Sequence, residues 1–449
     1  MQFDEALRYL LSLGHETLTL KLGLRTTELL LHALDDPQTC FPAVQIAGTN
    51  GKGSTAVVLD SICRAAGIKT GLFTSPHLAD ITERIKIDGR DISQAAFAEL
   101  ATTVRDRAEA LVHAGALLAA PTFFEQVTAI AFLAFRQANV ALAILETGLG
   151  GRLDATTAAQ AETVCLTPIA LDHQEYLGET LAEIAAEKAA IIRPNVRAIV
   201  AAQPQAVLDV ILLRCKIART TPRIDACDMR VEGATADGRM RVTFETNQDC
   251  YGQVLLGLRG RHQVINVALA IQLAEALRER GFQIPALAIS QGIEQARHAG
   301  RLELLEDQPG RPKLLFDGAH NPAGAVALRE YLDEFAVGPI TLVFGAMRDK
   351  NLAAMADVLF PCAHRLILTQ PDNPRSADPA TIGEYVPKSI RGQTLTLEPS
   401  PARAIQAAYD QTAADGLICV TGSLYLVGEI ENLVRQNARE QVAKPELRN

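Results

Sequence analysis

Several features that mark specialised proteins are missing from this sequence. Its eight cysteines form no C-x-x-C pair, and no histidine accompanies the closest two, Cys215 and Cys227, at a metal-ligand spacing. No apolar run is long enough to cross a membrane, and Met1–Glu5 lacks the basic and apolar segments of a signal peptide. We therefore expect free thiols and a cytosolic protein that does not enter membranes.

A basic excess is also missing. The chain has 43 Lys and Arg against 52 Asp and Glu, so its formal net charge is −9. This balance argues against nucleic-acid binding, although a local group of donors can still hold a small anion. The sequence contains no internal repeat and no low-complexity tract. Its 449 residues, 48% hydrophobic and 21% charged, predict a globular protein of two domains.

Strand-like and helix-like segments alternate through the first part of the chain. The apolar, β-rich runs are Val44–Ala47, Thr70–Phe73, Val140–Leu145, Val164–Leu166 and Ala198–Ala201. Helical periodicity covers Phe123–Gln137, Leu181–Ile192 and Val264–Arg280. This alternation predicts an α/β domain with a mostly parallel sheet covered by helices. Between Ile224 and Leu258 the pattern changes to short alternating runs, which predict a small antiparallel excursion.

The same alternation restarts after Arg301. The predicted strands are Lys313–Phe316, Thr341–Phe344, Arg365–Leu368 and Leu417–Val420. The predicted helices are Ala323–Phe335, Leu352–Leu359, Pro401–Ala414 and Leu424–Gln436. We therefore expect a smaller, Rossmann-like α/β domain over residues 299–449, following a domain over residues 1–298. Residues 438–449 are polar, and we expect them to be frayed.

The segment Gly48–Thr55, GTNGKGST, is the strongest chemical signal. It lies between the strand Val44–Ala47 and a predicted helix over Ala56–Ala66. Glycines at such a turn let backbone N–H groups approach a phosphate, Lys52 can reach its oxygens, and Ser54 or Thr55 can hold Mg²⁺. The spacing is shorter than the common phosphate-loop pattern, so a plain structural turn is the alternative.

Polar residues also follow other predicted strands. Glu146 begins the run Glu146–Asp154, ETGLGGRLD, directly after a buried strand, where a carboxylate can hold Mg²⁺ in the ligand crevice of a parallel sheet. A strand-end acid in solvent is the alternative. Asp317–Pro322, DGAHNP, follows Lys313–Phe316 in the same way, and there the alternative is an Asx turn with a helix cap.

Four further positions are weak signals by themselves. His173 has three interpretations: a metal ligand, a general base or a loop histidine. Ser75 has two: a metal ligand, or a helix cap or turn. Lys188 lies among apolar residues on a helix, where a lone lysine usually extends to solvent. Arg259–Asn266 leads into a long helix, and its basic and amide side chains could bind a nucleotide.

In their order along the chain, these motifs resemble the folylpolyglutamate synthase/dihydrofolate synthase family of the Mur ligase superfamily. The matching segments are Gly48–Ser54, Thr74–Leu78, Glu146–Asp154, Leu171–His173 and Asp317–Pro322. The resemblance runs from about Lys21–Leu24 to Gly422–Tyr425. The pattern Lys21-x-Gly-Leu resembles the one common in members described mainly as polyglutamate synthases.

The resemblance implies an ATP-dependent ligase that joins a pterin-bearing carboxylate to L-glutamate, with Mg²⁺ at two sites. The implied ATP-binding residues are Thr49, Asn50, Gly51, Lys52, Gly53, Ser54, Asn266, Arg301 and Asp317. The implied metal ligands are Ser54, Ser75, Glu146, His173 and Lys188, the last carbamylated in many members. The implied substrate-binding residues are Thr122, Phe124, Glu125, Arg152, Asp154 and Ser423. The implied catalytic residues are Lys52, Lys188 and His320, and the resemblance also implies a monomer.

Two other functions remain open at this point. One is a Mur-type ligase that acts on another carboxylate acceptor, such as a cell-wall nucleotide precursor. The other is a nucleotide-gated binding protein that makes no ligation product. The Asp317–Pro322 cluster favours a ligase, because a switch does not need reactive groups in the second domain.

Overall fold

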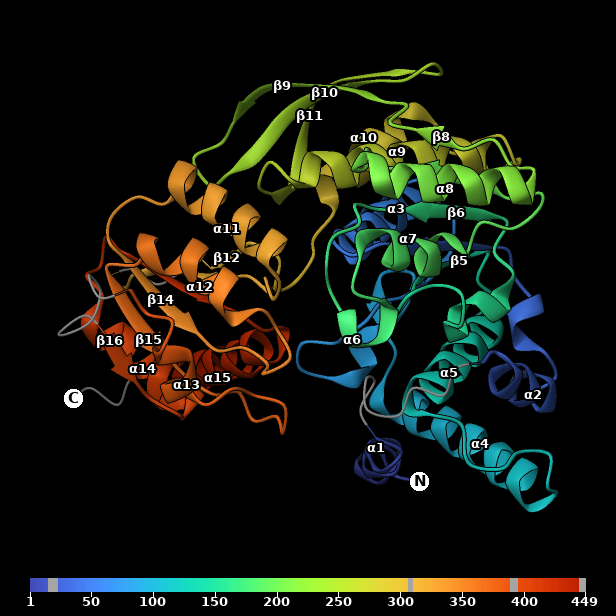
Figure 1. Cartoon of the computed structure of the whole chain (residues 1–449), viewed down its shortest axis with the longest axis horizontal. Helices are drawn as coiled ribbons and strands as arrows, with labels where there is room; N and C mark the ends of the chain where they lie inside the picture. The colour runs from blue at the N-terminus through green and yellow to red at the C-terminus, as the bar shows by residue number, and fades with distance from the viewer. Residues whose placement is uncertain (15–22, 306–309, 388–394, 444–449) are drawn as a thin grey trace.

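The computed structural model describes residues 1–14, 23–305, 310–387 and 395–443. Two α/β units lie side by side, and a small antiparallel sheet lies across the top of the space between them (Figure 1). Lys21, on which part of the family resemblance depends, lies outside the described residues. Within the described residues, no helix combines the length and apolar character needed to cross a bilayer.

The first sheet has eight strands in the order β4-β3-β2-β5-β1-β6-β7-β8. Their bounds are β1 Ala43–Ala47, β2 Thr70–Phe73, β3 Ile85–Ile87, β4 Arg90–Asp91, β5 Leu142–Glu146, β6 Thr163–Leu166, β7 Arg197–Val200 and β8 Arg223–Ile224. From β2 to β8 all neighbours are parallel, which confirms the predicted parallel sheet. Only β3 and β4, at one edge, pair antiparallel.

Helices cover both faces of this sheet. One face carries α3 (Lys52–Ala65), α9 (Gln263–Arg278) and α10 (Ala286–Gln295). The other carries α1 (Phe3–Ser12), α2 (Arg25–Ala33), α4 (Gln94–His113) and α5 (Phe123–Ala138), while α7 (Leu181–Ala189) and α8 (Gln205–Ala218) pack near β6 and β7. In β5, Leu142 and Ile144 join the first core, and Ala143 and Leu145 join the second. This alternation explains why β5 is a continuous apolar run.

The predicted antiparallel excursion is the three-stranded sheet β11-β10-β9, with bounds β9 Asp228–Ala234, β10 Arg239–Glu245 and β11 Cys250–Arg259. Its buried face joins the core around α9. The turn between β9 and β10 also touches the second unit, because the Tyr331 hydroxyl donates to the carbonyl of Asp237 at 3.1 Å.

The second unit has a six-stranded sheet in the order β12-β13-β17-β14-β15-β16. The strands are β12 Glu303–Leu305, β13 Lys313–Phe316, β14 Ile340–Phe344, β15 Arg365–Leu368, β16 Leu395–Leu397 and β17 Leu417–Thr421. All neighbours are parallel except β12 and β13. The helices are α11 Pro322–Phe335, α12 Leu352–Leu359, α13 Pro379–Gly383, α14 Pro401–Gln411 and α15 Leu424–Ala443. Because α15 continues to Ala443, the prediction that residues 438–449 are frayed was wrong for residues 438–443.

Candidate active site

A cavity of about 390 Å³ lies where the carboxyl ends of the two parallel sheets face each other. Its wall includes residues that follow β1, β5 and β6 in the first unit and β13, β14 and β17 in the second. All predicted site residues except Arg152 line this cavity. Parallel strands direct their carboxyl-end loops to one edge, so segments far apart in the chain meet here.

The strand, loop and helix predicted around Lys52 are present, and α3 begins at Lys52 rather than at Ala56. Gly51 precedes α3 with a φ angle of +88°, and a Cβ atom there would be 2.1 Å from Oδ1 of Asn266. The side chain of Asn266 therefore lies directly against the loop. Lys52 and Ser54 lie in the first turn of α3, where N–H groups and the helix dipole favour an anion.

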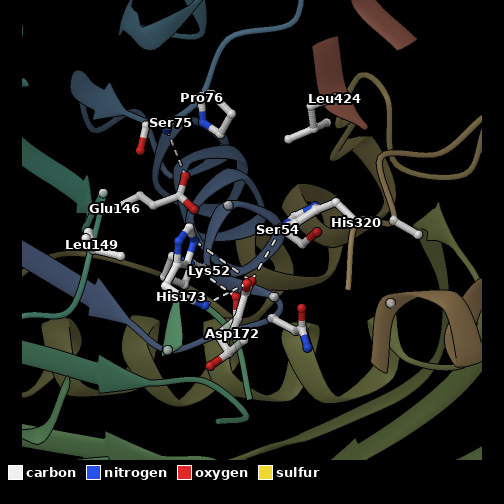
Figure 2. A pocket seen from close by; sticks show the side chains of 18 of the residues that line it. Lys52, Ser54, Ser75, Pro76, Glu146, Leu149, Asp172, His173, His320 and Leu424 are labelled. Atoms are coloured by element: carbon white, nitrogen blue, oxygen red, sulfur yellow. Dashed lines mark hydrogen bonds and ion pairs between the residues drawn. The ribbon is translucent and has the colours of Figure 1, made fainter. Parts of the chain in front are cut away.

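Glu146 and two hydroxyl side chains lie beside this loop. The Glu146 carboxylate accepts a hydrogen bond from the N–H of Ser75 at 3.1 Å, and Figure 2 shows the two side chains together near Lys52 and Ser54. One carboxylate and two hydroxyl groups are hard oxygen donors, which suit a Mg²⁺ ion held mainly through phosphates. In the described part of the chain, no three His, Cys, Asp or Glu side chains form a metal cluster.

Lys188 comes from α7, and its ammonium group is buried rather than extended to solvent. Its Nζ donates a hydrogen bond to the carbonyl of Gly48 at 2.8 Å, and the residue is 4% exposed. Burial, assisted by the nearby charge of Lys52, lowers the pKa of Lys188 to about 7. A large fraction of this amine is therefore neutral near pH 7, and a neutral amine is nucleophilic.

Asp172 links the two units inside the cavity. Its Oδ1 accepts from Nζ of Lys350 at 2.7 Å and its Oδ2 from Nδ2 of Asn321 at 3.2 Å. Figure 2 shows Asp172 with His173 and His320 nearby, and the closest His320 distance is 3.8 Å, from Nε2 to Oδ2. Burial would raise the pKa of Asp172, but the charge and hydrogen bond of the Lys350 ammonium group outweigh burial and hold the pKa below its usual range. Burial lowers the pKa of His173 to about 3 and that of His320 to about 4, so both rings are neutral at pH 7.

The second unit contributes Asp317, Arg301 and Ser423. The Asp317 carboxylate accepts from the N–H groups of Leu302 and Ala319, each at 3.0 Å, and burial raises its pKa. Nη1 of Arg301 donates to the carbonyl of Gly318 at 3.3 Å, which directs the guanidinium toward the loop after β13. Ser423 is buried, and its hydroxyl accepts from the N–H of Tyr425 at 3.1 Å.

Three of the predicted substrate-binding residues are also engaged in local structure. Thr122 and Glu125 form a reciprocal capping box at the start of α5. Asp154 accepts from the N–H groups of Gly148 and Leu149 at 2.8 and 3.0 Å, which holds the loop after β5. These bonds fix the wall of the cavity on which Phe124 lies.

Arg152 is not brought into the cavity. Its side chain is 53% exposed, and its Nε donates to Glu187 on α7 at 3.1 Å. The loop Glu146–Asp154 turns at its glycines, so that Asp154 points inward while Arg152 points outward. Its predicted role in substrate binding stays a prediction.

Known proteins match this chain over most of its length. Residues 46–274 match the Mur ligase middle domain, and residues 300–424 match the glutamate ligase domain of Mur ligases. A dihydrofolate synthase/folylpolyglutamate synthase of Bacillus subtilis is 33% identical over 92% of this chain and 95% of its own length. The chain belongs to the folylpolyglutamate synthase/dihydrofolate synthase family of Mur ligases. A probable bifunctional folylpolyglutamate synthase/dihydropteroate synthase of Haloferax volcanii is 35% identical over 96% of this chain, which spans only 50% of that relative.

Solved structures of Mur ligases in this family share the whole fold. Mycobacterium tuberculosis folylpolyglutamate synthase complexed with ADP has a TM-score of 0.87 and 30% identity, covering 96% of this chain and 98% of its own. An Escherichia coli protein in complex with DHPP and ADP has a TM-score of 0.85 and 28% identity, covering 98% and 99%. A bifunctional folylpolyglutamate synthase/dihydrofolate synthase with Mn, AMPPNP and L-glutamate bound has a TM-score of 0.81 and 26% identity, covering 97% and 98%.

Sequence reasoning missed several residues of this Mur ligase cavity. Lys350 and Met347 follow β14, so the rule that found Asp317 after β13 could have found them too. His262 lies in the segment Arg259–Asn266, which was noticed only as a weak signal. His298 lies between α10 and β12 with no motif around it, and only the three-dimensional structure brings it to Ser54.

Proposed function

We propose that this chain is an ATP-dependent ligase that adds L-glutamate to reduced folates, to dihydropteroate, or to both. One observation carries the proposal: the loop of Lys52 and the loop of Asp317 and His320 line the same cavity from opposite units. A ligase of this kind needs the nucleotide, the acceptor carboxylate and the incoming amine in one enclosed space. The cavity combines a phosphate-binding loop with apolar walls, including Phe124 and Leu149, that suit a flat ring.

The first proposed step activates the acceptor. A carboxylate is a poor electrophile, so one of its oxygens attacks the γ-phosphorus of ATP, ADP leaves, and an acyl phosphate forms. Lys52 would neutralise the phosphate charge, with Arg301 approaching from the second unit. Asn266 and Asp317 would contact the nucleotide, together with the backbone of residues 49–54. Closure of the two units would keep water from the acyl phosphate.

Mg²⁺ would be held at two places in this proposal. Ser54, Ser75 and Glu146 would hold one ion against the phosphates, and Glu146, His173 and Lys188 would hold the second. When bound, these ions would neutralise phosphate charge and orient the γ-phosphoryl group. The oxygen donors beside the loop support the first place.

The second place requires a change at Lys188, because an ammonium group repels a cation. We propose that its neutral amine attacks CO₂ and loses a proton, which gives a carbamate with an anionic oxygen. The pKa of about 7 supports this step, since a large fraction of the amine is unprotonated near neutrality. A carbamate keeps one N–H, so the 2.8 Å bond to the Gly48 carbonyl is compatible with the modification.

In the second step the amine of glutamate attacks the acyl carbon, phosphate leaves, and the nitrogen loses a proton. His320 is the proposed acceptor of that proton. Its Nδ1 lies 2.8 Å from the Gly318 carbonyl, which can only accept, so Nδ1 carries the proton of the neutral ring. Nε2 is therefore the basic nitrogen, and Asp172, 3.8 Å away, would stabilise the imidazolium that forms.

The remaining assignments are proposals as well. Thr122, Phe124, Glu125 and Asp154, which line the cavity, would contact the pterin-bearing acceptor, and Ser423 would lie near glutamate. The domain limits 1–298 and 299–449 fall between α10 and β12. A monomer in the cytosol is proposed too, and the eight unpaired cysteines agree with a reducing compartment.

The test is to incubate the protein with ATP, Mg²⁺ and L-glutamate plus either dihydropteroate or tetrahydrofolate, and to weigh the products. Addition of glutamate to both acceptors would indicate a bifunctional enzyme. Addition to only one acceptor would identify that acceptor as the substrate. ADP release that depends on glutamate without addition to either would favour a Mur-type ligase with another acceptor. ADP release that ignores glutamate would favour a nucleotide-gated binding protein.

A further inference from the structure

Ser54 has a hydrogen-bond partner that the proposed mechanism does not use. Its hydroxyl oxygen lies 3.2 Å from Nδ1 of His298. Ser54 is buried, and His298 is half-buried in the wall of the same cavity. A serine hydroxyl has one proton and two lone pairs, so the group that accepts the proton decides where the lone pairs point.

The segment that carries His298 is held on both sides. Before it, Ala296 packs tightly on β11, where a Cβ atom on Gly257 would be 2.4 Å from the carbonyl oxygen of Ala296. After it, the carbonyl of Gly300 accepts from the N–H of Gly318 at 2.8 Å. The imidazole therefore has a defined position relative to the first turn of α3.

His298 and Glu146 approach the same residue of that turn. A Cβ atom on Gly53 would be 3.0 Å from Cε1 of His298 and 3.2 Å from Oε2 of Glu146. The imidazole, the Glu146 carboxylate and the Ser54 hydroxyl thus surround one corner of the phosphate loop. Glycine at position 53 leaves the space that all three groups need.

We infer that His298 is a positioning residue for the nucleotide-bound divalent cation. Its Nδ1 accepts a hydrogen bond from the Ser54 hydroxyl, so that the lone pairs of the hydroxyl oxygen face the cation. The inference rests on the proposed function, because Ser54 is a proposed metal ligand. His298 acts through Ser54, because its Nδ1 is engaged in the hydrogen bond with the Ser54 hydroxyl. A partner of this kind fixes the orientation of a ligand and strengthens its bond to the metal.

The test measures cation binding rather than turnover, with Mn²⁺ as the probe. Free Mn²⁺ is counted by electron paramagnetic resonance while the full-length protein is titrated in saturating ADP. His298→Ala is expected to weaken Mn²⁺ binding about 3- to 10-fold, the effect of one lost hydrogen bond. His298→Asn keeps an acceptor near the position of Nδ1 and is expected to stay within about twofold of the wild type.

Two controls separate positioning from general damage. His113→Ala removes an exposed histidine on α4 and is expected to leave Mn²⁺ affinity unchanged, and thermal unfolding shows whether each variant is folded. In a Ser54→Ala background, His298→Ala is expected to have no further effect, because the two residues act as a unit.

The possible results are distinct. Wild-type Mn²⁺ affinity in a folded His298→Ala variant overturns the inference and leaves the proposed function intact. A loss that persists in the Ser54→Ala background and is not restored by Asn also overturns it, because His298 would then bind the cation itself. Failure of the wild type to bind Mn²⁺ with ADP would count against the proposed function and, with it, the inference.

Discussion

At the scale of single residues, burial changes what the two lysines of the cavity can do. Lys52 lies at the start of α3 and donates to the carbonyl of Thr49 at 3.2 Å, so its ammonium group stays at the loop where phosphates would bind. Lys188 is buried behind the same loop, and its pKa falls to about 7. The same kind of side chain is thus held at the phosphate loop at one position and buried behind it with a lowered pKa at the other.

Lys52→Ala is expected to lower kcat/KM for glutamate ligation by about 10³-fold or more, because the transferring phosphoryl group loses its cation. The rate is measured as ADP released in the presence of acceptor and glutamate. Lys216→Ala, which removes an exposed lysine on α8, is the matched control and should leave the rate unchanged. Near-normal turnover in Lys52→Ala would remove the phosphate-loop assignment.

Lys188→Ala is expected to lower the rate at least about tenfold, because the proposed carbamate oxygen is lost from the metal site. Short carboxylic acids such as acetate are expected to restore part of the rate by filling the space of the missing group. The same acids must not accelerate the wild type. If rescue fails and the intact mass of the wild type lacks a carbon dioxide adduct, the carbamate proposal is wrong.

At the scale of elements, the phosphate loop depends on how α3 begins. Gly51 at its start and Gly67 just after its end both have positive φ angles, +88° and +77°. A Cβ atom at Gly51 would meet Asn266, whereas at Gly67 it would meet nothing within 4 Å. The start of the helix is thus constrained by packing across the cavity, and its end only by the backbone.

These two glycines form a matched pair of variants. Gly67→Ala is expected to lower the free energy of unfolding by about 1–2 kcal/mol, the cost of a left-handed conformation for an L-residue. Gly51→Ala is expected to lower the free energy of unfolding by more than Gly67→Ala does. It is also expected to weaken ADP binding, because Asn266 must move. Urea unfolding and ADP titration of both variants check this, and equal ADP affinity in the two would contradict it.

At the scale of the whole molecule, the two units are held together by a buried ion pair. The side chains of Asp172 and Lys350 are 8% and 9% exposed, and their charged atoms are 2.7 Å apart. Asn321 extends the contact, because its amide nitrogen also donates to Oδ1 of Asn50 at 3.0 Å. The position of the second unit is therefore coupled to the phosphate loop by polar groups, and away from the loop Leu78 packs on the core of the second unit.

Asp172→Asn is expected to lower the free energy of unfolding by about 3 kcal/mol at pH 7, because Lys350 stays buried without its counter-charge. The pKa of Asp172 is held below its usual range, so its charge stabilises the fold above a pH of about 4 and this contribution is lost as the pH falls further. The difference between variant and wild type should therefore shrink toward pH 3.

Urea titrations at pH 7 and near pH 3 measure this difference. Asp333→Asn, which breaks the exposed pair of Asp333 with Arg329, is the matched control and should cost less than about 1 kcal/mol. A difference for Asp172→Asn that is the same at both pH values would show that the ion pair is not its source.

Much of the fold follows from local patterns in the sequence. The strands β1, β2, β5 and β6 are buried on both faces and largely apolar, and β13, β14, β15 and β17 repeat that pattern apart from the first residues of β13 and β15. Helices α4 and α8 were not predicted, because tertiary contacts rather than a strong local period decide which of their faces is buried. The antiparallel strands β3, β4 and β12 were missed because they are short.

The sequence by itself determined the phosphate loop, Glu146 and the Asp317 loop, because each follows a buried strand and strand ends in a parallel sheet share one edge. Only the tertiary structure decided that Arg152 points away, that Lys188 is buried, and that His298 reaches Ser54. Those outcomes depend on which segments pack beside each other across long separations in the chain. Local residue patterns do not carry that information.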